Sequence, residues 1–87
     1  MKDIELEELS SPGCSHCAVF KEFWEEEKVN WPNVKFTEYS LTDPAGQEMV
    51  QKYQIMASPG IVINGELFAT GGVDKNAFKA KLKELSE

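Results

Sequence analysis

Alternating apolar and polar residues predict a strand near the start of the chain. Within residues 3–10 the apolar side chains are Ile4, Leu6 and Leu9, and three glutamates share the segment with them. A period of two is typical of a strand with one buried face. The Ser-Pro-Gly sequence at 11–13 ends this strand, because proline and glycine interrupt regular structure.

A helix is predicted over residues 14–28. Val19 pairs with Phe23, and Phe20 with Trp24, at a spacing of four residues. Side chains at this spacing lie on the same side of a helix, so the four residues are expected to form one apolar stripe. Lysine and glutamate side chains occupy the other side.

The middle of the chain predicts an edge strand followed by a second helix. Apolar and polar residues alternate over residues 34–37, as in a half-buried strand. Asp43 precedes Pro44, and an N-cap residue followed by proline is typical of a helix start. We expect the buried face of this helix to consist of Ala45, Met49, Val50 and Tyr53.

The last third of the chain predicts a β-hairpin and a closing helix. Asn64 and Gly65 separate apolar segments at 60–63 and 67–69, and Asn-Gly in such a place is a strong hairpin signal. Asp74 is the expected N-cap of the final helix. The buried face of that helix is expected to consist of Phe78, Leu82 and Leu85.

The predicted order β-α-β-α-β-β-α indicates an α/β fold. A strand, a helix and a strand in series favour a right-handed parallel crossover, and the hairpin adds antiparallel pairing. We therefore expect a mixed four-stranded sheet flanked by helices. Residues 1–87 are expected to form one domain, because a chain this short builds a single core.

Charge limits the partners that the chain can take. It has 15 acidic residues against 9 basic ones, all lysine, and a net charge of −6. We expect no nucleic acid and no anionic membrane as partner, since both attract basic surfaces. No apolar segment approaches the roughly 20 residues of a membrane span, and the first residues lack the apolar centre of a signal peptide. The expected location is cytoplasmic.

Cys14 and Cys17 are the only cysteines, and they lie where the first strand gives way to the first helix. One helical turn separates them, so they can form a disulfide. Cys14 stands at the helix N-terminus, where free N–H groups and the helix dipole favour a thiolate. Cys14 is therefore the expected nucleophile. Cys17, further inside, is expected to resolve the mixed disulfide.

A metal site is the alternative interpretation of the two cysteines. A tetrahedral zinc site needs four ligands, whereas the chain offers one histidine, His16, and no further cysteine. No zinc site is expected within a single chain. Copper(I) on both thiolates, or zinc shared by two chains, stays open as a carrier function.

Two sequences carry a resemblance to a known family. Ser-Pro-Gly-Cys-Ser-His-Cys precedes the first helix, and Tyr-Gln-Ile-Met-Ala-Ser-Pro-Gly-Ile-Val-Ile-Asn-Gly leads into the hairpin. Over essentially its whole length the chain resembles the small thioredoxin/glutaredoxin-like redox proteins of archaea and bacteria. The resemblance implies a thioredoxin-like fold and a cis bond before Pro59, opposite the cysteines. It also implies that the backbone of Ser58 pairs with the bound substrate chain.

The same resemblance implies further site residues. Gly72 and Asp74 are similar to the glutaredoxin sequence that holds glutathione, although helix capping alone also explains Asp74. Glu8 stands six residues before Cys14, where thioredoxins keep a buried acid that assists proton transfer at the second cysteine. The other interpretation is that this strand, with its three glutamates, simply faces water at Glu8. His16 would stabilise the Cys14 thiolate and make the disulfide more oxidising. Its other interpretation is an exposed residue without a task.

The sequence therefore predicts a monomeric thiol-disulfide oxidoreductase that reduces protein disulfides and needs no organic or metal cofactor. Electrons would come from a thioredoxin-reductase-like enzyme or from glutathione as co-substrate. The Ser-His dipeptide between the cysteines differs from the Gly-Pro and Pro-Tyr of the family and leaves both reductants open. The alternative class is a binding module: a copper or zinc carrier, or a redox-silent thioredoxin-like domain that docks on an enzyme.

Overall fold

The computed structural model describes every residue from Met1 to Glu87 and contains one sheet with three α-helices. The strands are β1 Ile4–Ser10, β2 Val34–Ser40, β3 Gly60–Ile63 and β4 Glu66–Thr70. The helices are α1 Ser15–Glu27, followed by a 3₁₀ turn at Lys28–Asn30, α2 Pro44–Tyr53 and α3 Lys75–Ser86. None of the helices combines the length and the apolar character that crossing a membrane requires.

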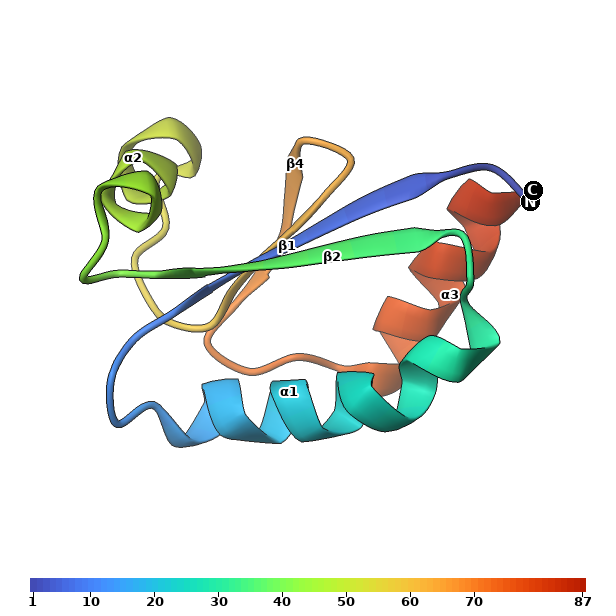
Figure 1. Ribbon diagram of the computed structural model, residues 1–87, viewed down its shortest axis with the longest axis horizontal. Helices are drawn as coiled ribbons and strands as arrows, with labels where there is room; N and C mark the ends of the chain where they lie inside the picture. The colour runs from blue at the N-terminus through green and yellow to red at the C-terminus, as the bar shows by residue number, and fades with distance from the viewer.

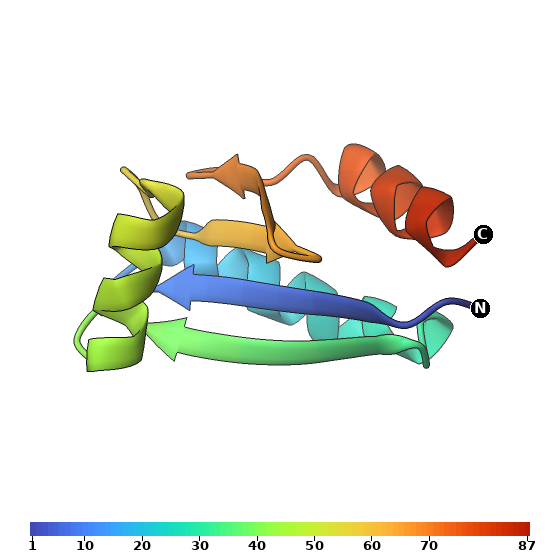
Figure 2. The same ribbon diagram turned by 90° about the horizontal axis from the view of Figure 1, so that it is seen from above.

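The sheet is mixed, as the element order predicts. Its strands follow the order β2-β1-β3-β4, with β1 parallel to β2 and the other two pairs antiparallel. β2 lies at an edge, as the alternating sequence predicts. α1 and α3 cover one face, and α2 lies on the other face at the end where β1 and β2 finish (Figure 1, Figure 2). The two chain termini lie at the opposite end of the molecule (Figure 1, Figure 2), where the N–H of Lys2 donates to the carbonyl of Ser86 at 3.2 Å.

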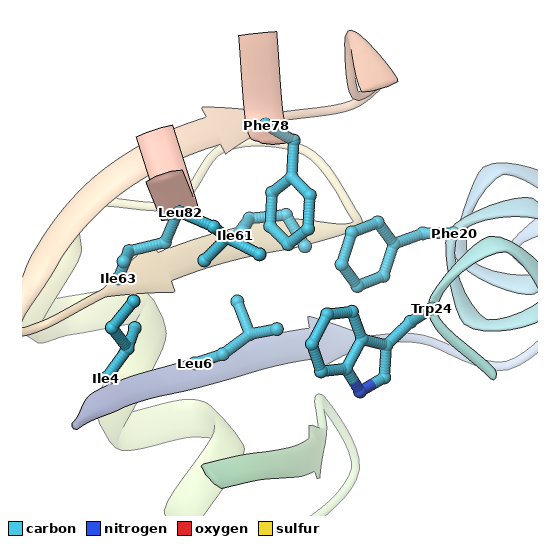
Figure 3. Close-up of a cluster of buried hydrophobic side chains, with 8 residues drawn as sticks. All are labelled: Ile4, Leu6, Phe20, Trp24, Ile61, Ile63, Phe78 and Leu82. Atoms are coloured by element: carbon cyan, nitrogen blue, oxygen red, sulfur yellow. The ribbon is translucent and has the colours of Figure 1, made fainter. Parts of the chain in front are cut away.

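Eight buried side chains form the main core between the sheet, α1 and α3 (Figure 3). Phe78 packs edge-on against two aromatic rings of α1, at centroid distances of 5.4 Å from Phe20 and 6.0 Å from Trp24. Burial of a large apolar side chain stabilises a fold by roughly 1.5–3 kcal/mol. The set consists of Ile4, Leu6, Phe20, Trp24, Ile61, Ile63, Phe78 and Leu82.

One residue of the predicted stripe on α1 lies outside the core. Val19 is 53% exposed, so only part of the predicted apolar stripe is buried. The buried positions of α1 are Cys17, Phe20 and Trp24. Val19 is turned away from Phe20 by about 100° around the helix axis, and the sheet covers only the flank that carries Phe20.

Helix α2 packs against a second, smaller core on the other face of the sheet. Ala45 is exposed, so its prediction as a core residue is wrong, and Gly46 is buried in its place. The absence of a side chain at Gly46 is required, because a Cβ there would overlap the carbonyl oxygen of Ser40. The buried members of this core are Leu9, Met49, Ile55 and Val62.

The hairpin between β3 and β4 forms at the predicted Asn-Gly pair. Asn64 and Gly65 both have positive φ, 51° and 81°, as a type I′ turn requires. Asn64 also connects the turn to β1: its Oδ1 accepts from the N–H of Glu5, and its own N–H donates to the Glu5 carbonyl, both at 2.8 Å. The turn is therefore held by the central strand as well as by its own geometry.

The two predicted N-caps behave differently. Oδ1 of Asp74 accepts a hydrogen bond from the N–H of Ala77 at 3.1 Å, so Asp74 caps α3. Asp43 occupies the N-cap position of α2, with Pro44 next to it, but its side chain makes no capping hydrogen bond. Asp43 is therefore the N-cap residue by position, as predicted, but its side chain does not stabilise the helix start through a hydrogen bond.

Candidate active site

The two cysteines form a disulfide at the N-terminus of α1, directly after the loop that leaves β1. Cys14 is the N-cap residue, and its Cα lies 5.2 Å from that of Cys17. The N–H of Cys17 donates to Sγ of Cys14 at 3.1 Å. Cys14 is partly exposed, whereas Cys17 is only 6% exposed. An attacking group from outside therefore meets the sulfur of Cys14 first.

Ser58 brings a hydroxyl to the disulfide. The bond between Ser58 and Pro59 is cis, as the resemblance predicts. Oγ of Ser58 donates to Sγ of Cys14 at 3.4 Å and lies 2.8 Å from Oγ of Ser11. The resemblance singled out only the backbone of Ser58, so sequence reasoning missed both hydroxyls. The available signal was a serine in each of the two loop motifs.

Glu8 is a fully buried acid on the face of β1 that α1 and α3 cover. It shares this face with Ile4 and Leu6, and neither of its carboxylate oxygens has a hydrogen-bond partner. Burial raises the pKa of Glu8 to about 7, with a further increase from Glu38 and an opposing effect of Lys21. A carboxyl group with this pKa can take up and release a proton near neutral pH. Sequence reasoning missed Glu38 and Lys21.

His16 and Gly72 lie at the same cavity, whereas the Asp74 side chain serves the helix. The cavity has a volume of about 240 Å³ between α1 and the start of α3. His16 is exposed at this cavity. The carboxylate of Asp74 accepts from the backbone of α3, as the capping interpretation predicts. The cavity is lined by His16, Val19, Phe20, Phe23, Gly72, Val73 and Lys75.

The structure contains no group of three or more His, Cys, Asp or Glu side chains placed to hold a metal ion. The only two thiols of the chain are joined to each other. The geometry around them therefore suits electron exchange between the dithiol and disulfide forms.

The fold and the disulfide define a thiol-disulfide oxidoreductase of the thioredoxin class. Residues 3–84 match the family model described as Thioredoxin domain, and the chain belongs to this family. It is similar to a thioredoxin of Methanocaldococcus jannaschii, with 32% identity over 84 residues that cover 97% of this chain and 98% of the relative. The protein is thus a protein-disulfide oxidoreductase with a redox-active cysteine pair.

Solved structures share the fold at lower sequence identity. Oxidised mitochondrial thioredoxin 3 from Saccharomyces cerevisiae gives a TM-score of 0.75 at 16% identity, covering 97% of this chain and 80% of that one. A chain of the complex between ferredoxin:thioredoxin reductase and thioredoxin f2 gives a TM-score of 0.77 at 12% identity, covering 99% and 80%. Both support the arrangement of sheet and helices described above.

Proposed function

We propose that Cys14 attacks disulfides of substrate proteins and that Cys17 resolves the mixed disulfide. The difference in exposure between the two sulfurs is the observation that carries these roles. In addition, Cys14 accepts hydrogen bonds from the Cys17 N–H and the Ser58 hydroxyl. Such donors favour the thiolate over the thiol and make Cys14 the better nucleophile at neutral pH.

The reaction begins with the reduced protein and a substrate disulfide. The Cys14 thiolate forms a bond to one substrate sulfur and releases the other as a thiolate. Glu8 takes the proton of the Cys17 thiol, and the resulting Cys17 thiolate attacks Sγ of Cys14. The second substrate sulfur then leaves. Two electrons pass to the substrate disulfide, and the Cys14–Cys17 disulfide forms.

The substrate chain is proposed to lie along the loop that precedes β3. The N–H and carbonyl groups of Ser58 make no hydrogen bond within the fold, so both are free to pair with an extended segment. The Pro59 carbonyl, in contrast, accepts from the N–H of Gly71 at 3.0 Å, which fixes the loop. His16 and Gly72 border the neighbouring cavity and would contact side chains of the substrate.

We propose a thioredoxin-reductase-like enzyme as the electron donor and glutathione as the alternative. The complex between ferredoxin:thioredoxin reductase and thioredoxin f2 contains a chain that is structurally similar to this one, which supports a dedicated reductase as the donor. A glutathione site would use Gly72 and Asp74, but the Asp74 carboxylate already caps α3. We further propose that the protein acts as a monomer without a bound cofactor. The cytoplasm suits this cycle, because its reductants keep protein thiols reduced.

Trapping of mixed disulfides tests the two cysteine roles. Cys17→Ser retains the nucleophile and loses the resolving thiol, so it should accumulate a covalent adduct with a model disulfide substrate. Cys14→Ser should accumulate almost none. Intact-mass analysis after brief exposure measures both adducts, with the double serine variant as control. Equal trapping by the two single variants would contradict the assignment.

Turnover with each reductant tests the electron donor. Insulin reduction is followed with a thioredoxin reductase plus NADPH, and separately with glutathione plus glutathione reductase. We expect faster turnover in the first system. Faster turnover with glutathione would assign the second donor instead and would leave the cysteine roles untouched.

A further inference from the structure

Glu8 has a charged neighbour on the adjacent strand. In the parallel register of β1 and β2, Glu8 is the Cα partner of Glu38. Residues paired in this way project from the same face of a sheet, so both carboxylates lie on the face that α1 covers. Glu8 is fully buried, whereas the side chain of Glu38 is 34% exposed. The two acids thus lie side by side, one inside and one at the surface.

Lys21 extends from α1 to this pair of acids. Its Nζ lies 3.2 Å from Oε1 of Glu38. Lys21 follows Cys17 by four residues, so the two side chains share one side of α1. The same helix face therefore carries the thiol that must lose a proton in the proposed cycle and the cation that holds Glu38.

We propose that Lys21 and Glu38 form a positioning pair that controls when Glu8 takes up and releases its proton. This inference rests on the proposed function, in which Glu8 accepts the proton of Cys17. The pair touches neither substrate nor sulfur in this scheme. It acts through Glu8, by setting the charge that Glu8 experiences from β2 and α1.

Glu38 and Lys21 are the main charged groups that influence the protonation of the buried Glu8. Its oxygens accept no hydrogen bond, so no donor fixes its ionised form. On β3 the residue opposite Glu8 is Ile61, which does not titrate. Glu38 on β2 raises the pKa of Glu8 and Lys21 on α1 lowers it. Cys17 is the further titrating group of α1, once the disulfide is reduced.

The ion pair itself has little value for stability. Lys21 is 53% exposed, and exposed ion pairs contribute only about 0–1 kcal/mol to folding. Solvent screens the effect of this ion pair on the buried Glu8 carboxylate less than it screens the attraction between Lys21 and Glu38 themselves, which are both partly exposed. A functional readout at Glu8 therefore separates the proposed role from a purely structural one.

Direct titration of Glu8 is the first part of the test. The side-chain carboxyl of Glu8 is followed by ¹³C NMR against pH in the oxidised protein. Glu38→Gln removes a like charge and should lower the pKa of Glu8 by roughly half to one unit, whereas Lys21→Met should raise it by a similar amount. Far-UV circular dichroism checks that both variants are folded.

A matched ion pair at the C-terminal end of α1 provides the control. Nζ of Lys28 lies 2.7 Å from Oε2 of Glu25, and both side chains are about as exposed as Lys21. Glu25→Gln and Lys28→Met make the same chemical changes away from Glu8. Neither should move the titration of Glu8. Equal shifts in both pairs would overturn the inference, because they would report only the net charge of the protein.

The second part of the test measures resolution of the mixed disulfide. The pH dependence of this step, followed in single turnover by rapid quench, should move to lower pH in Glu38→Gln and to higher pH in Lys21→Met. A Glu8 titration that fails to move, or one that moves while the resolution profile stays in place, overturns the inference. Neither result affects the roles of Cys14 and Cys17, which the trapping experiment tests separately.

Discussion

The hydroxyl of Ser58 donates a hydrogen bond to Sγ of Cys14 over 3.4 Å, although 44 positions separate the two residues in the chain. The same hydroxyl lies 2.8 Å from that of Ser11, so Ser11 is the donor in this second contact. The loop before α1 and the loop before β3 thus supply a chain of two hydroxyls that ends at Sγ of Cys14. A hydrogen bond to the ionised form of a group favours that form, so this contact stabilises the Cys14 thiolate after reduction.

Removal of the hydroxyl should therefore weaken the thiolate. We expect Ser58→Ala to raise the pKa of the reduced Cys14 thiol by roughly half to one unit. Because a less stable thiolate disfavours the reduced protein, the potential should become more negative, by up to about 30 mV for a full unit. Thiolate absorbance against pH and a glutathione redox equilibrium measure the two quantities.

Two further serine variants make this result specific. Ser11→Ala removes only the donor to Ser58 and should produce a smaller shift in the same direction. Ser86→Ala serves as control, because its hydroxyl contacts Asn33 near the chain termini and should leave Cys14 unchanged. A Cys14 titration that is the same in Ser58→Ala and in the wild type would contradict the prediction.

His16 should make the protein more oxidising than a thioredoxin. A partly protonated imidazole in the first turn of α1 stabilises the neighbouring thiolate, by an amount on the order of 1 kcal/mol. With about 30 mV for each 1.4 kcal/mol, we expect a wild-type potential near −230 mV, and a value on the order of 20 mV more negative in His16→Ala. A glutathione redox titration of both proteins at neutral pH decides this; identical potentials would make His16 a bystander.

Local signals predicted the parts of the fold that local geometry determines. The hairpin turn needs positive φ angles at both central residues, and Asn64 and Gly65 belong to the few residue types that adopt them readily. Helix positions were harder, because the sequence does not show which flank of a helix the sheet covers. Val19 was assigned to the apolar stripe from a four-residue spacing, and this spacing also fits an exposed flank of the helix. Gly46 carries no side chain, so no hydrophobic pattern could indicate its burial.

The sequence predicted those parts of the site that lie on a single helix or strand. It did not predict the parts that depend on how two strands pair. Cys14 and Cys17 were correctly placed at a helix N-terminus, because Ser-Pro-Gly ends the strand before them and the apolar stripe of the helix follows them. The burial of Glu8 was within reach, because alternation from Ile4 and Leu6 places Glu8 on the same face of β1. That Glu8 and Glu38 are neighbours could not be predicted. Their pairing depends on the register between β1 and β2, which sequence periodicity does not specify.

The two aspartates at helix starts should differ in their effect on stability. Asp74→Ala removes the hydrogen bond to the N–H of Ala77 and should lower the free energy of unfolding by about 1 kcal/mol. Asp43→Ala removes no such bond, so its cost should stay near 0.3 kcal/mol, roughly the effect of charge at a helix end. Urea unfolding at constant m-value measures both. Equal losses would indicate that the Asp74 bond contributes nothing beyond charge.

Asp74→Ser extends this comparison to glutathione. Serine is also a good N-cap, so this variant should keep the stability of the wild type while removing the carboxylate. We expect its glutathione-dependent turnover to equal that of the wild type. A selective loss of turnover with glutathione, and not with a thioredoxin reductase, would assign the Asp74 carboxylate to glutathione instead.

Glu8 should make the stability of the oxidised protein depend on pH between about 4.5 and 7. The pKa of Glu8 rises from 4.5 to about 7 on folding, mainly because of burial. In this range the folded state holds a proton that the unfolded state has lost, so the free energy of unfolding falls as pH rises. The penalty is absent below pH 4.5 and complete above pH 7, where the shift corresponds to about 3 kcal/mol.

Substitution by a neutral side chain should remove this dependence. Glutamine cannot ionise, so the free energy of unfolding of Glu8→Gln relative to wild type should increase by about 3 kcal/mol between pH 4.5 and 8. Burying the amide adds a cost that does not depend on pH and therefore does not change this difference. Glu5→Gln, on the same strand but exposed, should leave the pH dependence of the wild type nearly unchanged. Urea unfolding of the three proteins across this range measures the difference. Parallel curves for wild type and Glu8→Gln would mean that the pKa of Glu8 is the same in the folded and unfolded states, and its role as proton acceptor for Cys17 would then be lost.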